Sequence, residues 1–406
     1  MLNCFYWYGF IWSGVFILYT LKFSEFSMEL EPLLIVFFAM TIITSFILGY
    51  IYRTKLKFEY DQSKKLKTWK YSLPFFFLGA LAEFVYGGQI PLVAIAVRGS
   101  STYKEFSGIP IFHVLLTCAS TYYAIKCFYF ALCERKLRKK YLIHFLTVQF
   151  IYLLYFLRSQ ILFNLFCAGI LTLAFLKSKN KIKVYHVISA VLCIVLVLYV
   201  FGGLGNLRSG SRSWNNSSYI NELGLFDHWP DFLPEQFKWA YCYIVTPLSN
   251  LNYNIQEVKP SYAIMDFICE LVPQTIAKRV LMENRVSREV LVRSYFTATT
   301  GYSMIYSAMG YLGLFLYQIY LNVITIVGIH ISYKNRNRNR RTVFYSIVCL
   351  IYAYLFFTNT LYFVGTSFVL WIPFVGMMCK NRRITLNGKQ NILKTVNQHR
   401  FNFVRN

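Results

Sequence analysis

Charged residues are scarce in this chain, and acidic residues are the scarcest. Of its 406 residues, 15% are charged, and Asp and Glu together number only 17. A soluble domain usually carries about 25% charged residues. A large buried core could also lower the charge, but the apolar residues here form long runs near the ~20 residues that a bilayer crossing requires. The composition therefore indicates an integral membrane protein.

Several motifs that would identify an enzyme class are missing. The chain contains no Gly-rich P-loop, no H-E-x-x-H and no G-x-S-x-G, and its six His do not cluster. The ten Cys show no metal-ligand spacing such as C-x-x-C, so we expect no metal and no cofactor. The first apolar run lacks a basic flank and a small-residue cleavage site, and we expect it to be a retained span.

The chain contains ten long apolar segments. They predict an all-α, polytopic membrane protein with about ten transmembrane helices, organised as a single membrane domain over residues 1–406. The predicted spans are 5–22, 32–52, 71–88, 109–132, 141–157, 159–176, 185–202, 305–331, 343–361 and 362–379.

The basic residues predict the orientation of these spans. A net charge of +25 would suit nucleic acid, but the Lys and Arg lie in short clusters between apolar runs, as the positive-inside rule requires. Segments 53–70, 133–140, 177–183, 334–341 and 380–406 hold 28 of the 42 Lys and Arg. We therefore expect both termini and the basic tail 380–406 in the cytoplasm, and no nucleic-acid partner.

The same orientation leaves one large loop, 203–304, on the outer, periplasmic side. About 100 residues are too many for a simple connector. The loop also contains aromatic stretches, so we expect several helices that lie on or dip into the membrane face. Cys242 and Cys269 fall in this loop, and both a disulfide and two buried free thiols fit the sequence.

Few ionisable residues interrupt the spans. Glu83 lies in the outer third of the third predicted span, and His113 lies four residues into the fourth. Burying such groups in a membrane is costly, so they mark candidate functional positions. For each of them, two interpretations stay open: a polar group satisfied inside the helix bundle, or a catalytic group that faces an outer cavity.

Arginine on the outer side is more informative, because the positive-inside rule makes it scarce there. The planar guanidinium matches phosphate oxygens two at a time. A single outer Arg is commonly a lipid-headgroup anchor, whereas several at one depth favour a pyrophosphate site. Arg279 and Arg285 lie on this side. The candidate pyrophosphate ligands are Arg98, Arg158, Arg208, Arg212, Arg288 and Arg293.

Two consecutive motifs carry a resemblance to a known family. Glu83 to Leu92 reads E-F-V-Y-G-G-Q-I-P-L, and Tyr103 to Val114 reads Y-K-E-F-S-G-I-P-I-F-H-V. Together they resemble the pattern E-F-x-Y-x-G-x-I-P-L followed by Y-x-x-F-G-I-P-x-x-H of the oligosaccharide repeat-unit polymerases, the O-antigen polymerases of the Wzy type. Ser107 is inserted before the Gly of that pattern.

Weaker matches extend the resemblance over roughly residues 75–380. Residues 205–208 lead to an aromatic run at 239–243 and to Pro-Leu-Ser-Asn-Leu at 247–251, as in the family. Residues 306–313 are similar to its Y-x-D-x-G-x-x-G entry into a late span, but the acidic position is lost here.

The resemblance implies a metal-independent glycosyltransferase at the outer face of the bacterial inner membrane. It would join undecaprenyl-pyrophosphate-linked repeat units into O-antigen of lipopolysaccharide or into capsule, with a flippase and a chain-length regulator as partners. Glu83 is the first candidate base and His113 the second. The candidate sugar-stacking residues are Tyr103, Trp214, Trp239 and Tyr241.

Three alternatives share part of this pattern. An O-antigen ligase would have the same architecture and donor but a lipid A core as its acceptor. A lipid-oligosaccharide flippase would usually have more spans, internal repeats and charged central cavities. A non-catalytic membrane scaffold would leave the outer arginines unexplained.

Overall fold

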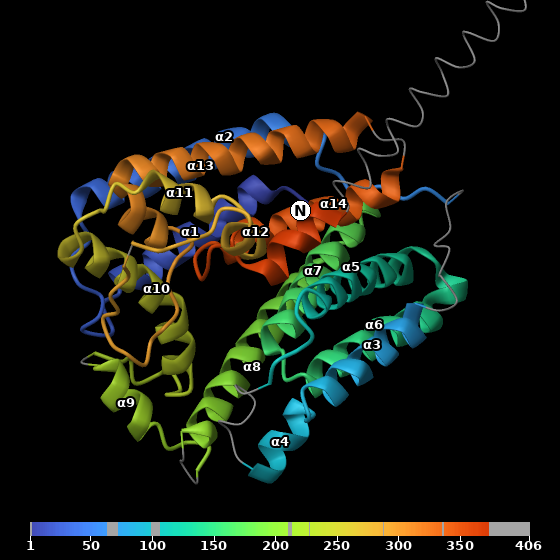
Figure 1. The fold of residues 1–406 in the computed structure, drawn as a ribbon, viewed down its shortest axis with the longest axis horizontal. Coiled ribbons are helices and arrows are strands. Elements are labelled where there is room, and N and C mark those ends of the chain that lie inside the picture. The colour runs from blue at the N-terminus through green and yellow to red at the C-terminus, as the bar shows by residue number, and fades with distance from the viewer. Residues whose placement is uncertain are drawn as a thin grey trace, which may run out of the picture.

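The computed structural model describes residues 2–62, 72–98, 106–209, 213–226, 228–286, 288–334 and 337–372. Within these ranges the chain forms helices, turns and extended connections, and no strand (Figure 1). Residues 364–372 are also helical. The helices, in chain order, are α1 (Cys4–Thr20), α2 (Pro32–Tyr52), α3 (Ser72–Tyr86), α4 (Pro91–Arg98), α5 (Phe112–Cys133), η2 (Arg135–Leu137), α6 (Arg138–Leu154), α7 (Arg158–Ser178), α8 (Val184–Arg208), α9 (Ser218–Gly224), α10 (Phe237–Glu257), α11 (Ile264–Glu270), α12 (Gln274–Arg279), α13 (Ser303–Lys334) and α14 (Arg338–Tyr354).

The described helices include several that are suited to a membrane. By length and hydropathy, α2, α5, α7 and α13 could each cross a bilayer, and α3 and the Ile194–Asn206 part of α8 are shorter apolar helices. Each of the first nine predicted spans overlaps one helix. Of the tenth, the described part is helical from residue 364 to 372. The prediction of an all-α chain with the helices of a multi-pass membrane protein is confirmed at this level.

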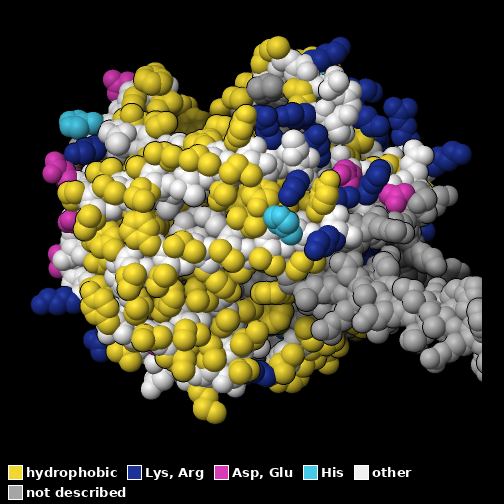
Figure 2. Space-filling view, turned by 90° about the horizontal axis from the view of Figure 1, so that it is seen from above, with side chains coloured by type: hydrophobic (Ala, Val, Ile, Leu, Met, Phe, Trp, Pro, Cys, Tyr) yellow, Lys and Arg dark blue, Asp and Glu magenta, His cyan; other side chains and the backbone are white. Residues whose placement is uncertain are grey.

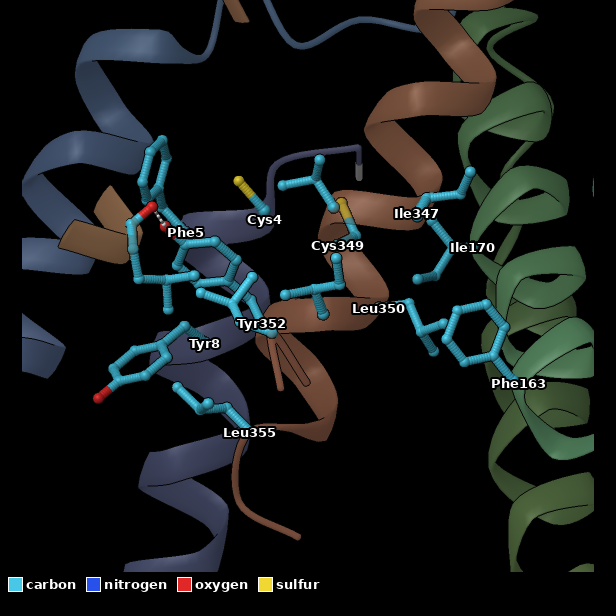
Figure 3. Packing of buried hydrophobic residues seen from close by; sticks show 14 of the residues in the cluster. Cys4, Phe5, Tyr8, Phe163, Ile170, Ile347, Cys349, Leu350, Tyr352 and Leu355 are labelled. Carbon is cyan, nitrogen blue, oxygen red and sulfur yellow. Dashed lines mark hydrogen bonds between the residues drawn. The ribbon is translucent and has the colours of Figure 1, made fainter. Parts of the chain in front are cut away.

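α14 lies between α1 and α7 and packs against both (Figure 3). Phe5 and Tyr8 of α1 and Tyr352 of α14 are fully buried, and the rings of Phe5 and Tyr352 meet edge to face with centroids 5.6 Å apart. On its other side, α14 meets Ile170 of α7 in the same cluster. Because lipid is as apolar as these side chains, the contact is stabilised by close packing rather than by removal from water.

The pairing of α1 with α2 depends on small residues. A Cβ on Gly49 of α2 would lie 2.4 Å from the Tyr6 ring, and one on Gly9 of α1 would lie 2.9 Å from the Phe46 ring. Each glycine therefore admits an aromatic ring of the opposite helix. Small residues at such positions are typical of helix pairs within membranes.

The exterior of the bundle is apolar where a soluble protein would be polar. α2 buries Leu34, Phe37 and Phe38, yet it also exposes Leu33 and Ile43 on its other side. Figure 2 shows apolar side chains across the middle of one face, with Lys and Arg gathered toward the right. A helix that is apolar all round, and exposed on one side, is suited to face lipid on that side.

Segments expected on one side of the membrane meet at one end of the bundle. Glu59 forms an ion pair with Arg341, with Oε2 and Nη2 2.6 Å apart, and the Tyr60 hydroxyl donates to Glu134 at 3.1 Å. At the opposite end, the connection between α1 and α2 meets the long loop. There the Glu31 amide donates to Oδ1 of Asn252 at 2.9 Å.

The loop 203–304 contains the helices that its aromatic stretches predict. α9, α10, α11 and α12 fall within it. α10 is not a surface helix, because it packs against α1, α8 and α13. Cys242 and Cys269 are both buried free thiols. Of the two interpretations that the sequence allowed, the structure agrees with two free thiols rather than a disulfide.

Candidate functional site

Glu83, His113 and Tyr155 converge from three helices. Oε2 of Glu83, on α3, lies 2.8 Å from Nδ1 of His113 on α5, and it accepts a hydrogen bond of 2.5 Å from the Tyr155 hydroxyl at the end of α6. Glu83 is fully buried, whereas the His113 side chain is 29% exposed. Of the three, His113 is therefore the group that a substrate can reach from outside.

The sequence around the cluster explains its geometry. α3 buries Phe76, Ala80, Glu83 and Phe84, a helical spacing that turns Glu83 toward the bundle. The neighbouring rings of Phe84 and Tyr155 have centroids 4.6 Å apart. The carboxylate therefore sits in aromatic surroundings, which keep water away from it.

Two glycines of the resemblance motifs allow the close packing. A Cβ on Gly108 would lie 2.8 Å from Cγ of His113, and one on Gly87 would lie 2.6 Å from the Phe106 ring. The Phe106 ring in turn packs against Tyr155, with centroids 5.7 Å apart. Gly87 of the first motif therefore packs against Phe106 of the second, and Gly108 makes room for His113 within the second motif.

The hydrogen bonds define what His113 can do. A buried carboxylate is costly unless it is paired, and Glu83 is paired through Oε2 alone. Its Oε1 accepts no hydrogen bond from the residues that the structure describes. With Nδ1–H donating to Glu83, the imidazole is left with Nε2 as a proton acceptor. A carboxylate that orients a histidine in this way is a common arrangement for general-base catalysis.

Arg158 lies three residues beyond Tyr155, at the first position of α7. Its side chain is exposed, and its guanidinium carbon sits 4.7 Å from the centroid of the Phe156 ring. It forms no ion pair with any residue in the described ranges. An Arg without a described ion-pair partner at the start of a 21-residue helix is suited to bind an anion, because the helix N-terminus adds partial positive charge.

Not every candidate pyrophosphate ligand can be located. Arg98 and Arg208 are the last residues of α4 and α8, but their side chains lie outside the description. Arg212 and the candidate sugar-stacking residue Tyr103 lie outside the described residues. Their contribution to the site stays a prediction.

Arg288 and Arg293 are exposed and lie on an extended segment before α13. The backbone amide of Arg288 donates to the Ser307 hydroxyl at 2.9 Å, which ties this segment to α13. The segment therefore has a defined course, with both guanidinium groups on the surface.

Arg285, unlike Arg158, forms ion pairs with acidic residues of the same loop. Its Nη2 lies 3.0 Å from Oε1 of Glu270, and its Nε contacts Glu283. Asn359 donates to Oε2 of Glu270 at 2.7 Å, which fastens the loop to the turn after α14. Burial raises the pKa of Glu270 to about 7, against the opposing effect of Arg285. We therefore assign this cluster to loop anchoring.

The three located aromatic candidates have different surroundings. Trp239 lines a cavity, and its Nε1 donates to Oδ1 of Asn206 at 2.7 Å. Trp214 is partly buried, with its ring against Gly203 of α8. Tyr241 is buried in the packing between α10 and the connection after α1, where its hydroxyl contacts Ser27 at 3.0 Å. Of the three, Trp239 is the one that lines this cavity.

That cavity has a volume of about 480 Å³. Its walls come from the start of α7, from α9 and α10, from residues 295–299 and from residues 354–366. Ser159 and Gln160, the residues after Arg158, form part of the wall. Arg158 and the cavity therefore share the N-terminal end of α7. The size is within the range of about 300–1,000 Å³ that is typical of small-molecule sites.

Two asparagines on successive turns of α10 hold one wall of the cavity. Asn250 donates to the carbonyls of Phe296 and Ala298 at 2.9 and 2.8 Å and accepts from the Val292 amide at 2.9 Å. Asn254 accepts from the Val290 amide at 2.8 Å. Sequence reasoning missed this role. The available signal was a pair of Asn spaced four apart in a helix, beginning in the Pro-Leu-Ser-Asn-Leu motif.

No protein-family model, curated protein or solved structure matches this chain. The resemblance of residues 83–114 to the repeat-unit polymerases therefore stays an expectation from the sequence motifs alone.

Proposed function

We propose that this chain polymerises undecaprenyl-pyrophosphate-linked oligosaccharide repeat units into a surface polysaccharide, as O-antigen or capsule, at the periplasmic face of the bacterial inner membrane. The observation that carries the proposal is the pairing of Glu83 with His113 at 2.8 Å, with the exposed Arg158 near the same helix ends. A buried acid that orients a partly exposed histidine supports proton transfer, and an exposed arginine that forms no ion pair with a described residue supports an anionic leaving group.

In the proposed reaction, a hydroxyl of the acceptor sugar attacks the anomeric carbon of the donor glycan. Nε2 of His113 takes the hydroxyl proton as the new carbon–oxygen bond forms. The bond from the anomeric carbon to the pyrophosphate breaks, and undecaprenyl pyrophosphate leaves with the electron pair. Arg158 stabilises the negative charge that collects on the leaving pyrophosphate.

Glu83 was the first candidate base from the sequence, but its surroundings favour a positioning role. The side chain is fully buried, and its Oε2 already accepts from His113 and Tyr155. The partly exposed His113 is better suited to meet the acceptor hydroxyl. In this proposal Glu83 orients the imidazole and stabilises its protonated form, while Tyr155 fixes the carboxylate.

The proposal includes ten spans, cytoplasmic termini and the loop 203–304 outside. Basic segments meet at one end of the bundle, through Glu59 and Arg341 among others. His113 opens α5, Tyr155 follows α6 and Arg158 opens α7, so the candidate site lies at the opposite ends of these helices. This arrangement supports a site on the outer face, where lipid-linked repeat units become available after translocation.

Deletion of the gene in its native host tests the proposal. We expect the extracted glycan to collapse from a ladder to a core that carries a single repeat unit, because export and ligation still operate. Loss of all repeat units from the core, with polymer accumulating on the lipid carrier, would instead indicate a ligase. Single lipid-linked units trapped inside the cell would indicate a flippase, and an unchanged ladder would contradict the proposal.

A further inference from the structure

The cavity beside α10 has no assigned ligand, although its wall chemistry is specific. From that chemistry we infer that the cavity binds a short, uncharged stretch of the glycan and discriminates against a sugar that carries a carboxylate. This inference rests on the proposed function, because it specifies which part of the lipid-linked substrate the protein recognises. It adds a constraint on the repeat unit that the polymerase motifs do not contain.

Aromatic rings provide much of the wall. The Tyr243 and Phe357 rings lie nearly parallel, at 16° with centroids 6.3 Å apart, and they come from α10 and from the turn after α14. The Tyr219 and Trp239 rings form a second such pair at 23° and 6.4 Å. Sugar rings present apolar C–H faces that pack against aromatic surfaces, so these walls suit a carbohydrate.

Several hydroxyl groups in the wall make no hydrogen bond with a described residue. Thr246 is only 2% exposed, yet its hydroxyl makes no hydrogen bond with any described residue. The same holds, within the described ranges, for the hydroxyls of Tyr243 and Tyr354. Thr246 is buried and the two tyrosines are partly exposed, so all three hydroxyls keep hydrogen-bonding capacity that a ligand in the cavity can use. Each hydroxyl can both donate and accept, which matches the hydroxyls of a sugar.

Charge separates this cavity from its surroundings. None of the described residues that line it is charged. Arg158, by contrast, is exposed and adjoins the wall residue Ser159. A carboxylate inside the cavity would lose water without gaining a cationic partner. The arrangement therefore assigns the anionic pyrophosphate to the edge, near Arg158, and the neutral sugars to the interior.

Binding to the purified full-length chain in nanodiscs tests this inference. The probes are end-labelled oligosaccharides of one to three repeat units, cut from the surface polysaccharide of the host by partial acid hydrolysis. The comparison probes are the same oligosaccharides after oxidation of their primary hydroxyls to carboxylates. We expect the oxidised probes to bind at least tenfold more weakly, and equal or tighter binding of the oxidised probes would overturn the inference.

Variants connect that binding to the cavity. Thr246→Val and Tyr243→Phe should each weaken binding of the unmodified probe by about three- to tenfold, the value of one or two hydrogen bonds. Thr358→Asp adds a carboxylate to a partly exposed wall position and should abolish binding. Thr172→Val is the matched control, since among the described residues its hydroxyl donates only to the Ala168 carbonyl of the same helix, α7.

The outcomes separate this inference from the proposed function. Wild-type probe affinity in all three cavity variants, with normal membrane insertion, would overturn the cavity assignment even if gene deletion collapses the glycan ladder. If deletion leaves the ladder unchanged, the polymerase proposal fails instead. Should Thr358→Asp prevent insertion, the Thr246→Val and Tyr243→Phe measurements still decide the question, because each removes only one oxygen.

Discussion

Replacement of His113 by Ala is expected to slow repeat-unit transfer by about 10²–10⁴-fold, the usual contribution of a general base. Nε2 of His113 is the proposed acceptor of the hydroxyl proton, because Nδ1 is held by Glu83. The measurement is the number of repeat units added per minute by membranes that contain equal amounts of inserted protein. Glycan extracted from complemented deletion cells should show one repeat unit on the core.

Three further variants separate proton transfer from packing. Glu83→Gln keeps the shape and removes the charge, and it should slow transfer while leaving the affinity for the lipid-linked unit unchanged. Glu83→Asp should restore part of the rate. His330→Ala is the control, since that histidine is exposed on α13 and bonds to the Ile326 carbonyl of its own helix. Normal chain lengths in inserted His113→Ala protein would contradict the base assignment.

Replacement of Arg158 by Ala is expected to lower the transfer rate by about 10²–10³-fold, the loss seen when one donor to a developing negative charge is removed. The guanidinium is exposed, unpaired among the described residues and located at the start of α7. Arg158→Lys keeps the charge but cannot form bidentate hydrogen bonds with a phosphate, so it should retain an intermediate transfer rate. The length distribution of the glycan and the initial rate both report the effect.

Arg53 offers a matched control for Arg158. It is also exposed, and its guanidinium carbon lies 3.9 Å from the centroid of the Tyr50 ring, at the end of α2 where the basic segments gather. Arg53→Ala should therefore leave chain length unchanged. Equal effects of the two substitutions, or wild-type polymer from Arg158→Ala, would show that Arg158 is a headgroup anchor rather than a pyrophosphate ligand.

The helices were predictable because lipid exposure leaves a simple signal. A lipid-facing helix such as α2 is apolar on all sides, so a hydrophobic run marks both its position and its length. The start of α14 was harder to predict from the sequence. The predicted span begins at residue 343, but the helix begins at Arg338, where Asn337 caps it and Glu59 neutralises Arg341. Asn337 is a local cap, but Glu59 lies 282 residues away in sequence and reaches Arg341 only through the tertiary fold.

The candidate site was predictable only in part. Glu83 and His113 stood out as polar residues in apolar spans, but their pairing depends on how α3 and α5 pack. Tyr155 was missed, since one tyrosine among 33 carries no signal of its own. The cavity could not be predicted at all, because its walls come from segments as distant as residues 159 and 366.

The packing of the loop 203–304 could likewise be predicted only in part. Its aromatic stretches predicted helices, but α10 is packed among other helices of the bundle. The buried polar groups of that helix, such as Asn250, would argue against burial if read alone. They are satisfied by the backbone of residues 290–298, a pairing that no local pattern encodes.

The most direct test of the central claim is polymer formation by the purified full-length chain in proteoliposomes supplied with undecaprenyl-pyrophosphate-linked repeat units. The account predicts lipid-linked products of two, three and more units, with one undecaprenyl pyrophosphate released for each glycosidic bond formed. It also predicts no such products from His113→Ala protein. Recovery of the substrate unchanged with the wild-type chain, or equal polymer from the two proteins, would contradict it.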